Sequence, residues 1–373
     1  MIWRPWKALS RRRDSSRLLL FFHETTWSGA PIQLLYLATW LKENSWTVAA
    51  AVPDPQTPES GPITPRLSEL GIDTFPILDL ALPANFQVLQ DLCREFDVVI
   101  ANTLVMWSAI HAARQTGVPS IWYIHESQVG RHLMDRIPEI KPALSCAHVL
   151  VTPTRRTAEL YQPYIARPIE VVPYGIPPNH VRPVSRLSSG PGFLLLGSYE
   201  PRKGQDIFLK AIRQIPEPHR ERATFRMAGR PLDKDFFAEL KSQAALLPGA
   251  ELGASLEHAE ALAAIAAADV LVCASRDETM PVAILEAMSM GKAIVTTQVG
   301  GIAEWLCHDR EALIVSPEDA GALAVALQRC LEEPSLRATL GKNARHTFQK
   351  HFSIDRLGKT FSRLITHLPK KSQ

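Results

Sequence analysis

The chain has 373 residues, of which 46% are hydrophobic, and this length exceeds one ordinary hydrophobic core, so we expect two domains. Its 41 lysines and arginines against 38 aspartates and glutamates leave a formal charge of +3, too small for the concentrated positive surface of a nucleic-acid-binding protein. The five cysteines are widely spaced and form no C-x-x-C pair, which indicates reduced core residues in a cytoplasmic protein.

Residues 1–16 form a basic tail in which Trp3 and Trp6 lie among arginines and lysines. This combination suits an anionic membrane surface, although a solvated tail is the more frequent outcome for such a segment. The apolar run that follows, Leu18–Phe22, is too short for the core of a signal peptide, and no stretch reaches the length of a membrane span. We therefore expect a cytoplasmic protein, with peripheral contact at the inner face of the membrane as the alternative.

Residues 17–172 are predicted to form an N-terminal Rossmann-like domain that faces the acceptor. Short β-branched or leucine-rich runs alternate here with amphipathic segments of helical length, the pattern of parallel strands joined by helical crossovers. Helices are predicted at Pro31–Glu43 and Phe86–Glu95, and the proline-rich stretch Pro53–Pro65 is predicted to be a surface loop. The predicted strands are Arg17–Phe22, Thr47–Val52, Thr74–Leu78, Val98–Asn102, Ser120–His125, His148–Thr152 and Ile169–Val172.

Residues 173–191 contain five prolines and are predicted to link this domain to a second one at residues 192–350. The chain is helical in pattern from Ser335 onward, and we expect residues 351–373 to pack back toward the first domain. Two doubly wound domains would place the carboxyl ends of both sheets around a central cleft, where ligands bind. The predicted strands of the second domain are Gly192–Leu196, Thr224–Ala228, Ala250–Leu252, Val270–Ala274, Ala293–Thr297 and Ala312–Val315.

The segment that follows the strand Val270–Ala274 is the most informative part of the second domain. It places Glu278 in a loop, Pro281 at the first position of a helix, and Glu286 in the second turn of that helix. The two carboxylates would then face one ligand, and the free N–H groups of Val282 and Ala283 would suit a diphosphate. The spacing by itself describes two solvated acids more often than a site.

A second polar segment follows the strand Gly192–Leu196. Gly197 and Ser198 form a turn that leads to Arg202, Lys203 and a predicted helix at Gln205–Gln214. A glycine turn, a cation and a helix N-terminus together predict an anion-binding site. Taken alone, an Arg-Lys pair is more often solvated than bound to a ligand.

Together these motifs resemble the retaining glycosyltransferases of family 4, which have the GT-B fold of two tandem Rossmann-like domains facing a central cleft. The resemblance covers most of the second half of the chain and is thinner in the first half. The motifs that carry it are Pro201-Arg-Lys-Gly204, the Glu278/Glu286 pair with Ala287-Met288, Gly291–Val295, Gly300–Glu304, Val172–Ile176, Ser28–Pro31 and Ile124–Glu126.

The resemblance implies a metal-independent transfer from a UDP- or GDP-sugar, without a separate cofactor. Lys203 would hold the donor diphosphate, Glu286 the ribose hydroxyls and Glu278 the hydroxyls of the sugar. His125 would lie near the sugar and help to shape the transition state. The residues expected to contact the donor are Gly29, Ala30, Ser198, Arg202, Lys203, Met280, Pro281, Val282, Ala283 and Glu286, and those expected to act in catalysis are His125, Lys203 and Glu278.

The sequence departs from the pattern of the family at two points. Many members have an arginine where this chain has Ser198, so one phosphate-binding cation is either missing or replaced by Arg202. The usual glycine between the paired glutamates is absent, and Met280 and Pro281 stand in that loop, which narrows its backbone freedom.

The expected activity is retaining transfer of a sugar to a glycan or lipid-linked acceptor in cell-envelope polysaccharide or glycan synthesis, without nucleic acid as a partner. A nicotinamide-dependent oxidoreductase could use Asp54 on a ribose, but the first turn has only Gly29 in place of a G-x-G-x-x-G fingerprint. A sugar-nucleotide epimerase of GT-B fold and a non-catalytic sugar-nucleotide-binding protein remain as alternatives.

Overall fold

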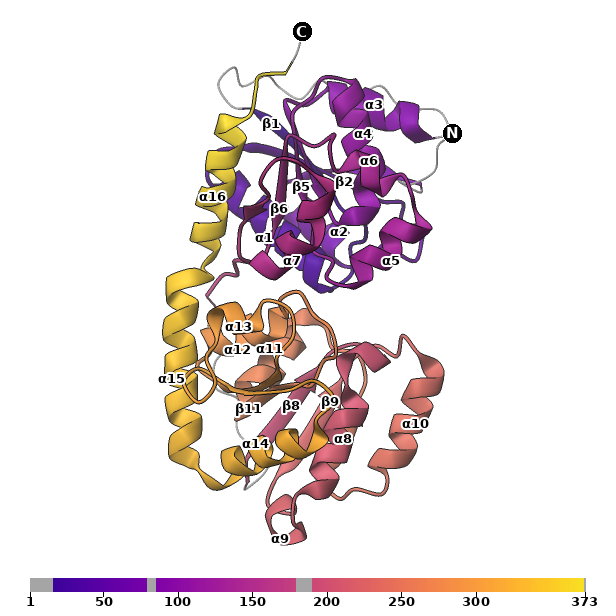
Figure 1. Cartoon of the computed structure of the whole chain (residues 1–373). Coiled ribbons are helices and arrows are strands. Elements are labelled where there is room, and N and C mark those ends of the chain that lie inside the picture. The colour runs from indigo at the N-terminus through magenta and orange to yellow at the C-terminus, as the bar shows by residue number, and fades with distance from the viewer. Residues whose placement is uncertain (1–15, 79–84, 179–189, 372–373) are drawn as a thin grey trace.

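The computed structural model describes residues 16–78, 85–178 and 190–371, which form two lobes stacked one above the other (Figure 1). In the described part of the N-terminal lobe, seven parallel strands follow the order β3-β2-β1-β4-β5-β6-β7, and in the C-terminal lobe six parallel strands follow the order β10-β9-β8-β11-β12-β13. Helices cover both faces of the sheets, so each lobe has the doubly wound arrangement that the alternating pattern predicts.

The strands of the N-terminal lobe are β1 (Arg17–Phe21), β2 (Thr47–Pro53), β3 (Asp73–Ile77), β4 (Val98–Asn102), β5 (Ser120–Tyr123), β6 (Val149–Thr152) and β7 (Glu170–Val171). Its helices are α1 (Gly29–Glu43), α2 (Ile63–Glu69), α3 (Phe86–Arg94), α4 (Trp107–Gln115), α5 (Val129–Arg136), α6 (Ile140–Ala143) and α7 (Arg155–Tyr161), with 3-10 turns η2 (Leu104–Met106) and η3 (Gln162–Tyr164).

The strands of the C-terminal lobe are β8 (Gly192–Leu196), β9 (Thr224–Ala228), β10 (Ala250–Gly253), β11 (Val270–Cys273), β12 (Ala293–Thr297) and β13 (Leu313–Val315). Its helices are α8 (Gln205–Gln214), α9 (Glu217–Arg220), α10 (Lys234–Ala244), α11 (His258–Ala267), α12 (Val282–Ser289), α13 (Ile302–Trp305), α14 (Ala320–Glu332) and α15 (Pro334–His351), with the 3-10 turn η4 (Pro201–Lys203). The last helix is α16 (Ile354–His367).

Every predicted strand has a counterpart in the structure, with ends that differ by at most two residues. The loop predicted over Pro53–Pro65 is wrong at its end, because α2 already begins at Ile63, where the apolar Ile63 and Leu67 bury one face of the helix. The basic tail up to residue 15 and residues 179–189 of the predicted linker lie outside the described residues. No helix in the described ranges is long and apolar enough to span a membrane.

The C-terminal helix returns from the second lobe to the first. In Figure 1, α15 lies beside the C-terminal lobe and α16 continues along the N-terminal lobe, where it packs on α1. Trp40 of α1 donates a hydrogen bond from Nε1 to Oδ1 of Asp355 at 2.8 Å. A Cβ at Gly358 would lie 2.0 Å from Cδ2 of Trp40, so the indole packs directly on the backbone of α16.

The chain crosses between the lobes twice, and the two crossings are bonded to each other. Ile176 donates from its backbone N–H to the carbonyl of Phe352 at 3.0 Å, and Ile354 donates to the carbonyl of Ile176 at 3.1 Å. Ile176 and Ser353 form an isolated parallel bridge. These bonds satisfy the backbone where the segment after β7 and the start of α16 run side by side.

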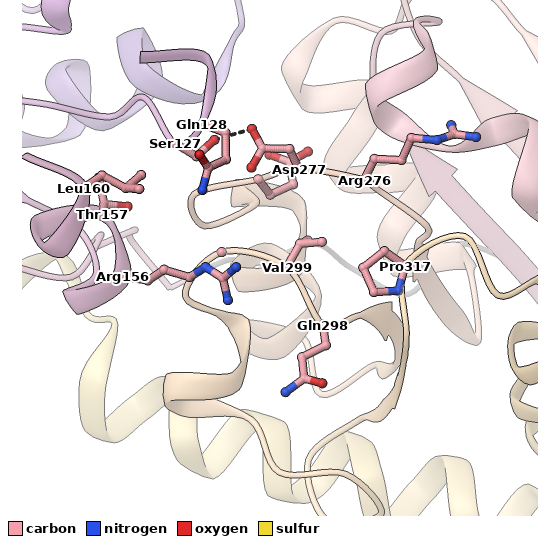
Figure 2. A pocket seen from close by; sticks show the side chains of 12 residues that line it. Ser127, Gln128, Arg156, Thr157, Leu160, Arg276, Asp277, Gln298, Val299 and Pro317 are labelled. Carbon is pink, nitrogen blue, oxygen red and sulfur yellow. Dashed lines mark hydrogen bonds between the residues drawn. The ribbon is translucent and has the colours of Figure 1, made fainter. Parts of the chain in front are cut away.

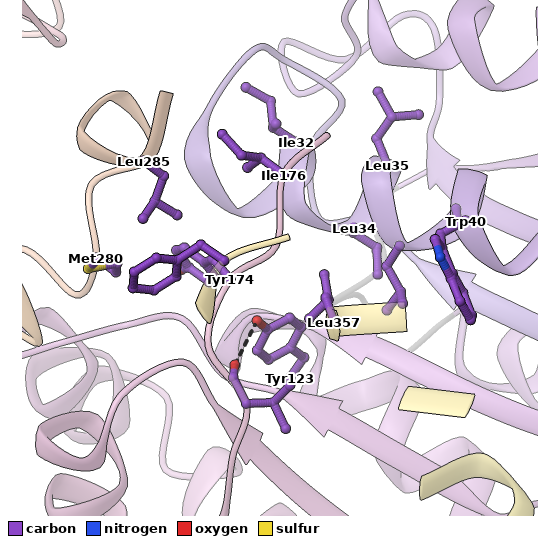
Figure 3. Close-up of a cluster of buried hydrophobic side chains, with 14 of the residues drawn as sticks. Ile32, Leu34, Leu35, Trp40, Tyr123, Tyr174, Ile176, Met280, Leu285 and Leu357 are labelled. Atoms are coloured by element: carbon purple, nitrogen blue, oxygen red, sulfur yellow. Dashed lines mark hydrogen bonds between the residues drawn. The ribbon is translucent and has the colours of Figure 1, made fainter. Parts of the chain in front are cut away.

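One apolar cluster is continuous between the lobes (Figure 3). Ile32 and Leu35 reach it from α1, whereas Met280 and Leu285 reach it from the loop before α12 and from α12 itself. Tyr174 lies between these two groups and is 4% exposed. The lobes are thus held together by buried apolar surface as well as by the two crossings.

Candidate active site

The turn between β8 and α8 brings Lys203 into the cleft. The 3-10 turn Pro201–Lys203 ends at Gly204, whose φ of 69° lies in the left-handed region that favours glycine. A Cβ at Gly204 would lie 2.0 Å from the carbonyl oxygen of Ala274, so the turn packs closely on the end of β11. This close approach places Lys203 beside the loop that follows β11.

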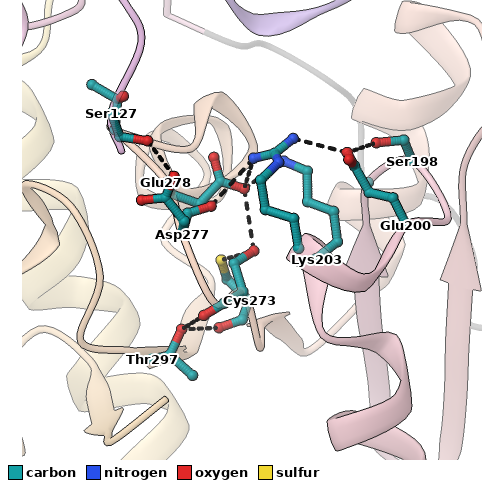
Figure 4. A network of polar contacts seen from close by, with 12 residues as sticks. Ser127, Ser198, Glu200, Lys203, Cys273, Asp277, Glu278 and Thr297 are labelled. Atoms are coloured by element: carbon teal, nitrogen blue, oxygen red, sulfur yellow. Dashed lines mark hydrogen bonds and ion pairs between the residues drawn. The ribbon is translucent and has the colours of Figure 1, made fainter. Parts of the chain in front are cut away.

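Lys203 forms an ion pair with Glu278 in that loop (Figure 4). The Lys203 side chain is 19% exposed and the Glu278 side chain 10%. Oε1 of Glu278 also accepts a hydrogen bond from Oγ of Ser275 at 3.2 Å and lies 3.5 Å from Nη1 of Arg202. The structure thus brings these two predicted site residues into a direct contact that the sequence did not indicate.

The cations around Glu278 decide its charge. Burial by itself raises the pKa of Glu278, but Lys203 and Arg202 more than offset this effect and leave the pKa below its ordinary value. Glu278 is therefore ionised at neutral pH. A diphosphate that binds at Lys203 would compete with this carboxylate for the ammonium group.

Ser198 and Arg202 meet at a third residue, Glu200. Oγ of Ser198 donates to Oε1 of Glu200 at 2.6 Å, and Nη2 of Arg202 donates to the same oxygen at 2.8 Å. Burial lowers the pKa of Arg202, but Glu278 and Glu200 raise it above its usual value. Arg202 thus remains charged beside Lys203.

The N-termini of two helices, one from each lobe, face each other across the cleft. A Cβ at Gly29, the first residue of α1, would lie 3.6 Å from Cγ2 of Val282, the first residue of α12. Pro281 is the N-cap of α12 and not its first residue, so the sequence prediction was off by one position. The carbonyl of Ala30 accepts a hydrogen bond from Asn102 at 3.1 Å. Free N–H groups and helix dipoles converge in this way on a place suited to an anion.

Two other expected donor contacts lie close to this point but are largely covered. Met280 is 4% exposed and belongs to the apolar cluster between the lobes, and Ala283 packs partly against the same cluster. Their backbone, at the start of α12, lines the region between Glu278 and Glu286. The side chain of Met280 fixes the loop before α12, in the place where a glycine would leave it freer.

Glu286 lies in α12 with its side chain 5% exposed. Its Oε1 is 2.8 Å from Nε2 of His258, the first residue of α11. The His258 ring stacks on Trp27 of the N-terminal lobe, with 5.3 Å between ring centroids and 27° between ring planes. Nε1 of Trp27 donates to Oε2 of Glu257 at 2.8 Å. Sequence reasoning missed Trp27 and His258.

His125 is buried after β5, and both of its ring nitrogens are bonded within the N-terminal lobe. Nε2 pairs with Oδ1 of Asn102, which requires a proton on Nε2, and Nδ1 therefore accepts from the Tyr174 hydroxyl at 2.8 Å. Burial, followed by the nearby His23, holds the pKa of His125 well below its ordinary value. The backbone carbonyl of His125 accepts a hydrogen bond from Oγ1 of Thr279 at 2.5 Å, and this bond joins the lobes.

A pocket of about 140 Å³, open to solvent, has Glu278 in its lining (Figure 2). Its walls come from the loop after β5 and from helix α7 in one lobe, and from the segments after β11, β12 and β13 in the other. Oγ of Ser127 donates to Oδ2 of Asp277 at 2.5 Å across it. The residues that line the pocket are Ser127, Gln128, Arg156, Thr157, Leu160, Arg276, Asp277, Glu278, Gln298, Val299, Gly300 and Pro317.

The motif Gly300–Glu304 joins the lobes behind this pocket. The carboxylate of Glu304 accepts hydrogen bonds from the backbone N–H groups of Arg155 at 3.0 Å and Arg156 at 2.9 Å. A Cβ at Gly301 would lie 2.2 Å from Cγ2 of Thr154, so the lobes are in close contact here. Within the described ranges, no group of three or more His, Cys, Asp or Glu side chains is placed to hold a metal ion.

Two Rossmann-like lobes with their strand ends turned toward one cleft define the GT-B class of glycosyltransferases. A family model described as "Glycosyltransferase Family 4" matches residues 27–180, and one described as "Glycosyl transferases group 1" matches residues 182–347. Together the two models span most of the sequence. The chain belongs to the group 1 glycosyltransferases.

Among curated proteins, the chain is similar to the glycogen synthase of Mycobacterium tuberculosis, with 27% identity over 277 residues. The match covers 69% of this chain and 65% of the relative, so it spans just under two thirds of that protein. A second relative is the sulfoquinovosyl transferase SQD2 of Arabidopsis thaliana, with 28% identity over 173 residues, 44% of this chain and 32% of that protein.

The fold is shared with solved structures at low sequence identity. The structure of Anabaena HepE in complex with UDP and glucose has a TM-score of 0.80 at 18% identity and covers 95% of this chain and 100% of that one. The sucrose-phosphate synthase of Thermosynechococcus elongatus has a TM-score of 0.77 at 21% identity and covers 94% and 98%.

Proposed function

We propose that this protein is a retaining, metal-independent glycosyltransferase that moves a sugar from a nucleoside-diphosphate sugar to an acceptor hydroxyl. The observation that carries the proposal is the Lys203–Glu278 ion pair, which lies beside the facing N-termini of α1 and α12. The pair combines a cation for a leaving diphosphate with a carboxylate that can accept hydrogen bonds from sugar hydroxyls. A solvated surface pair would not be this deeply covered.

In the proposed reaction, the acceptor hydroxyl attacks the anomeric carbon on the face from which the nucleotide leaves. The bond from this carbon to the acceptor oxygen forms as its bond to the phosphate oxygen breaks, and that phosphate oxygen takes the hydroxyl proton. Lys203 and Arg202 would stabilise the charge that develops on the diphosphate, together with the helix N-termini. Catalysis would then come from positioning and electrostatics, without an enzymic nucleophile.

The proposed donor is a UDP- or GDP-sugar, with Glu286 on the ribose hydroxyls and Glu278 on the sugar. HepE, which shares the fold, has been crystallised in complex with UDP and glucose and with UDP-glucose, which supports a uridine nucleotide here. The pocket that has Glu278 in its lining offers a path for the acceptor. We propose a glycan or lipid-linked acceptor of the cell envelope, used at the cytoplasmic face of the membrane.

The role of His125 in this reaction is proposed to be indirect. Because both of its ring nitrogens are bonded to Asn102 and Tyr174, the group nearest to the sugar would be its backbone, which is fixed to the opposite lobe through Thr279. A neutral, firmly held imidazole supports the shape of the cleft and carries no proton to the reaction. In the proposed reaction, the leaving phosphate takes its proton from the acceptor hydroxyl and not from His125.

The first test is to screen nucleotide sugars for thermal stabilisation and then to assay transfer. A ligand at one hundred times its dissociation constant adds about 2.7 kcal/mol to the free energy of unfolding, which such a screen detects readily. We expect stabilisation by UDP- or GDP-sugars, and transfer or slow donor hydrolysis with retained anomeric configuration by NMR. Activity should persist in excess chelator. Inverted product, or activity that chelator abolishes, would contradict the proposed mechanism, and a rearranged donor sugar without transfer would indicate an epimerase.

A further inference from the structure

The Glu286 carboxylate is bonded to the ring of His258, which in turn contacts two rings of the N-terminal lobe. His258 bonds to the carboxylate at 2.8 Å, and the rings of Trp27 and Tyr36 lie 5.3 Å and 6.4 Å from that of His258, measured between centroids. Burial, followed by the charge of Glu286, raises the pKa of Tyr36. The motif that predicts Glu286 as a ribose ligand predicts none of these rings.

The hydrogen bond to His258 fixes the direction in which Glu286 presents its oxygens. A glutamate has three rotatable bonds, and one that must meet two ribose hydroxyls binds more tightly if it is held in place beforehand. His258 is suited to this task because it is the first residue of α11, and Glu257 and Glu260 cap the N-terminus of this helix with a capping box. The ring therefore projects from a well-fixed backbone.

Trp27 holds His258 from the opposite lobe. Its indole stacks on the imidazole, and its N–H donates to Glu257, the residue directly before His258. Two contacts from one side chain thus restrain both the ring and the start of its helix. Because Trp27 and Glu257 lie in different lobes, this hydrogen bond forms only where the two lobes are in contact.

We propose that His258 is a positioning residue of the donor site, which orients Glu286 toward the ribose hydroxyls, and that Trp27 locks it in place when the lobes close. This inference rests on the proposed function, because it takes Glu286 as the ribose ligand. It adds two residues that set the preference for a ribonucleotide. The preference for a ribonucleotide would then depend in part on the N-terminal lobe, because Trp27 of that lobe acts on Glu286 indirectly, through His258.

The test is the ratio of dissociation constants for the deoxy and the ordinary nucleotide, measured by calorimetry with UDP, GDP and their 2′- and 3′-deoxy forms. A hydrogen bond to a charged group contributes enough that the wild type should prefer the ribonucleotide about tenfold or more. Glu286→Gln should lose most of this preference. His258→Phe, which keeps a ring to stack on Trp27, should reduce the preference to about threefold or less, and Trp27→Ala should reduce it in the same direction.

Two further variants separate positioning from a general loss of structure. His258→Gln retains a side-chain N–H donor and should recover part of the preference. His351→Phe is the matched control, because His351 also packs on a tryptophan, Trp305, with 4.8 Å between ring centroids, but lies on α15. It should leave the ratio unchanged.

The outcomes distinguish this inference from the proposed function. If the wild type binds neither UDP nor GDP, or Glu286→Gln keeps the full preference, the assignment of the donor site is wrong and the inference fails with it. If Glu286→Gln behaves as expected but His258→Phe discriminates like the wild type, the donor site stands and the positioning role alone is refuted. The same conclusion follows if His351→Phe changes the ratio as much as His258→Phe does.

Discussion

Replacing Lys203 by alanine should separate what the ion pair does for the reaction from what it does for the fold. The ammonium group is the nearest cation to Glu278, and in the proposed reaction it faces the leaving diphosphate. The loss of one fixed donor to a developing negative charge typically costs ~10²- to 10³-fold in turnover, about 2.7–4 kcal/mol. We therefore expect Lys203→Ala to reduce the rate constant of transfer by at least about a hundredfold.

The effect on stability should be smaller than for a fully isolated charge. Breaking a buried ion pair typically costs ~3–5 kcal/mol, because one charge is left without a partner. Here Arg202 remains 3.5 Å from Glu278 and Ser275 still donates to it, so we expect a loss of about 1–3 kcal/mol. The double variant Lys203→Ala/Glu278→Gln should recover most of this loss in urea denaturation, because it removes the uncompensated charge. It should not recover turnover.

Lys210→Ala is the matched control for these measurements. Lys210 lies in α8, seven positions after Lys203, with its side chain 56% exposed, and it pairs with Asp206 at 3.5 Å in an ordinary surface contact. This variant should change both turnover and stability little. If Lys203→Ala turned over within threefold of the wild type, or if the double variant recovered the rate together with the stability, Lys203 would have only a structural role.

Two further predictions concern stability. Burial raises the pKa of Glu126 to about 7 from an ordinary 4.5, despite backbone N–H donors such as that of Leu104, so the folded chain retains a proton that the unfolded chain loses. The free energy of unfolding should therefore fall by up to about 3 kcal/mol as pH rises from 4.5 to 7. In urea denaturation, Glu126→Gln should make the free energy of unfolding depend less on pH. If the wild type and Glu126→Gln showed the same dependence on pH, Glu126 would not be the group responsible. Gly358→Ala should lower the melting temperature clearly because its Cβ would meet Trp40 at 2.0 Å, whereas Gly321→Ala, whose Cβ would approach nothing closer than 3.4 Å, should not; equal melting temperatures would show that α16 shifts freely.

The fold could be predicted from the sequence because its signals are local. Most strands are short apolar runs, and a proline or glycine directly follows several of them, such as β6, β8 and β9, so the order of elements and the two-lobe division follow from the pattern. The ends were less certain, as the early start of α2 at Ile63 shows. Helix α2 buries one apolar face, formed by Ile63 and Leu67, and the prolines around this face hide its pattern in the sequence.

The site could be predicted only as far as motifs with fixed spacing reach. Lys203, Glu278 and Glu286 stand in such motifs, and the structure brings the first two into contact. The residues around Glu286 could not be found in this way, because His258 meets it through the packing of α11 against α12, and Trp27 meets His258 through the contact between the lobes. No local pattern encodes a contact between lobes.

The bridge between Ile176 and Ser353 makes the two chain crossings a single pivot. Two strands bonded at one place hold the lobes closest together at that place, so a separation of the lobes would be smallest next to this bridge and largest at the edge furthest from it. Removing the chain from Ser353 onward would take away the second crossing and its hydrogen bond from Ile354 to Ile176, and one crossing alone would then join the lobes.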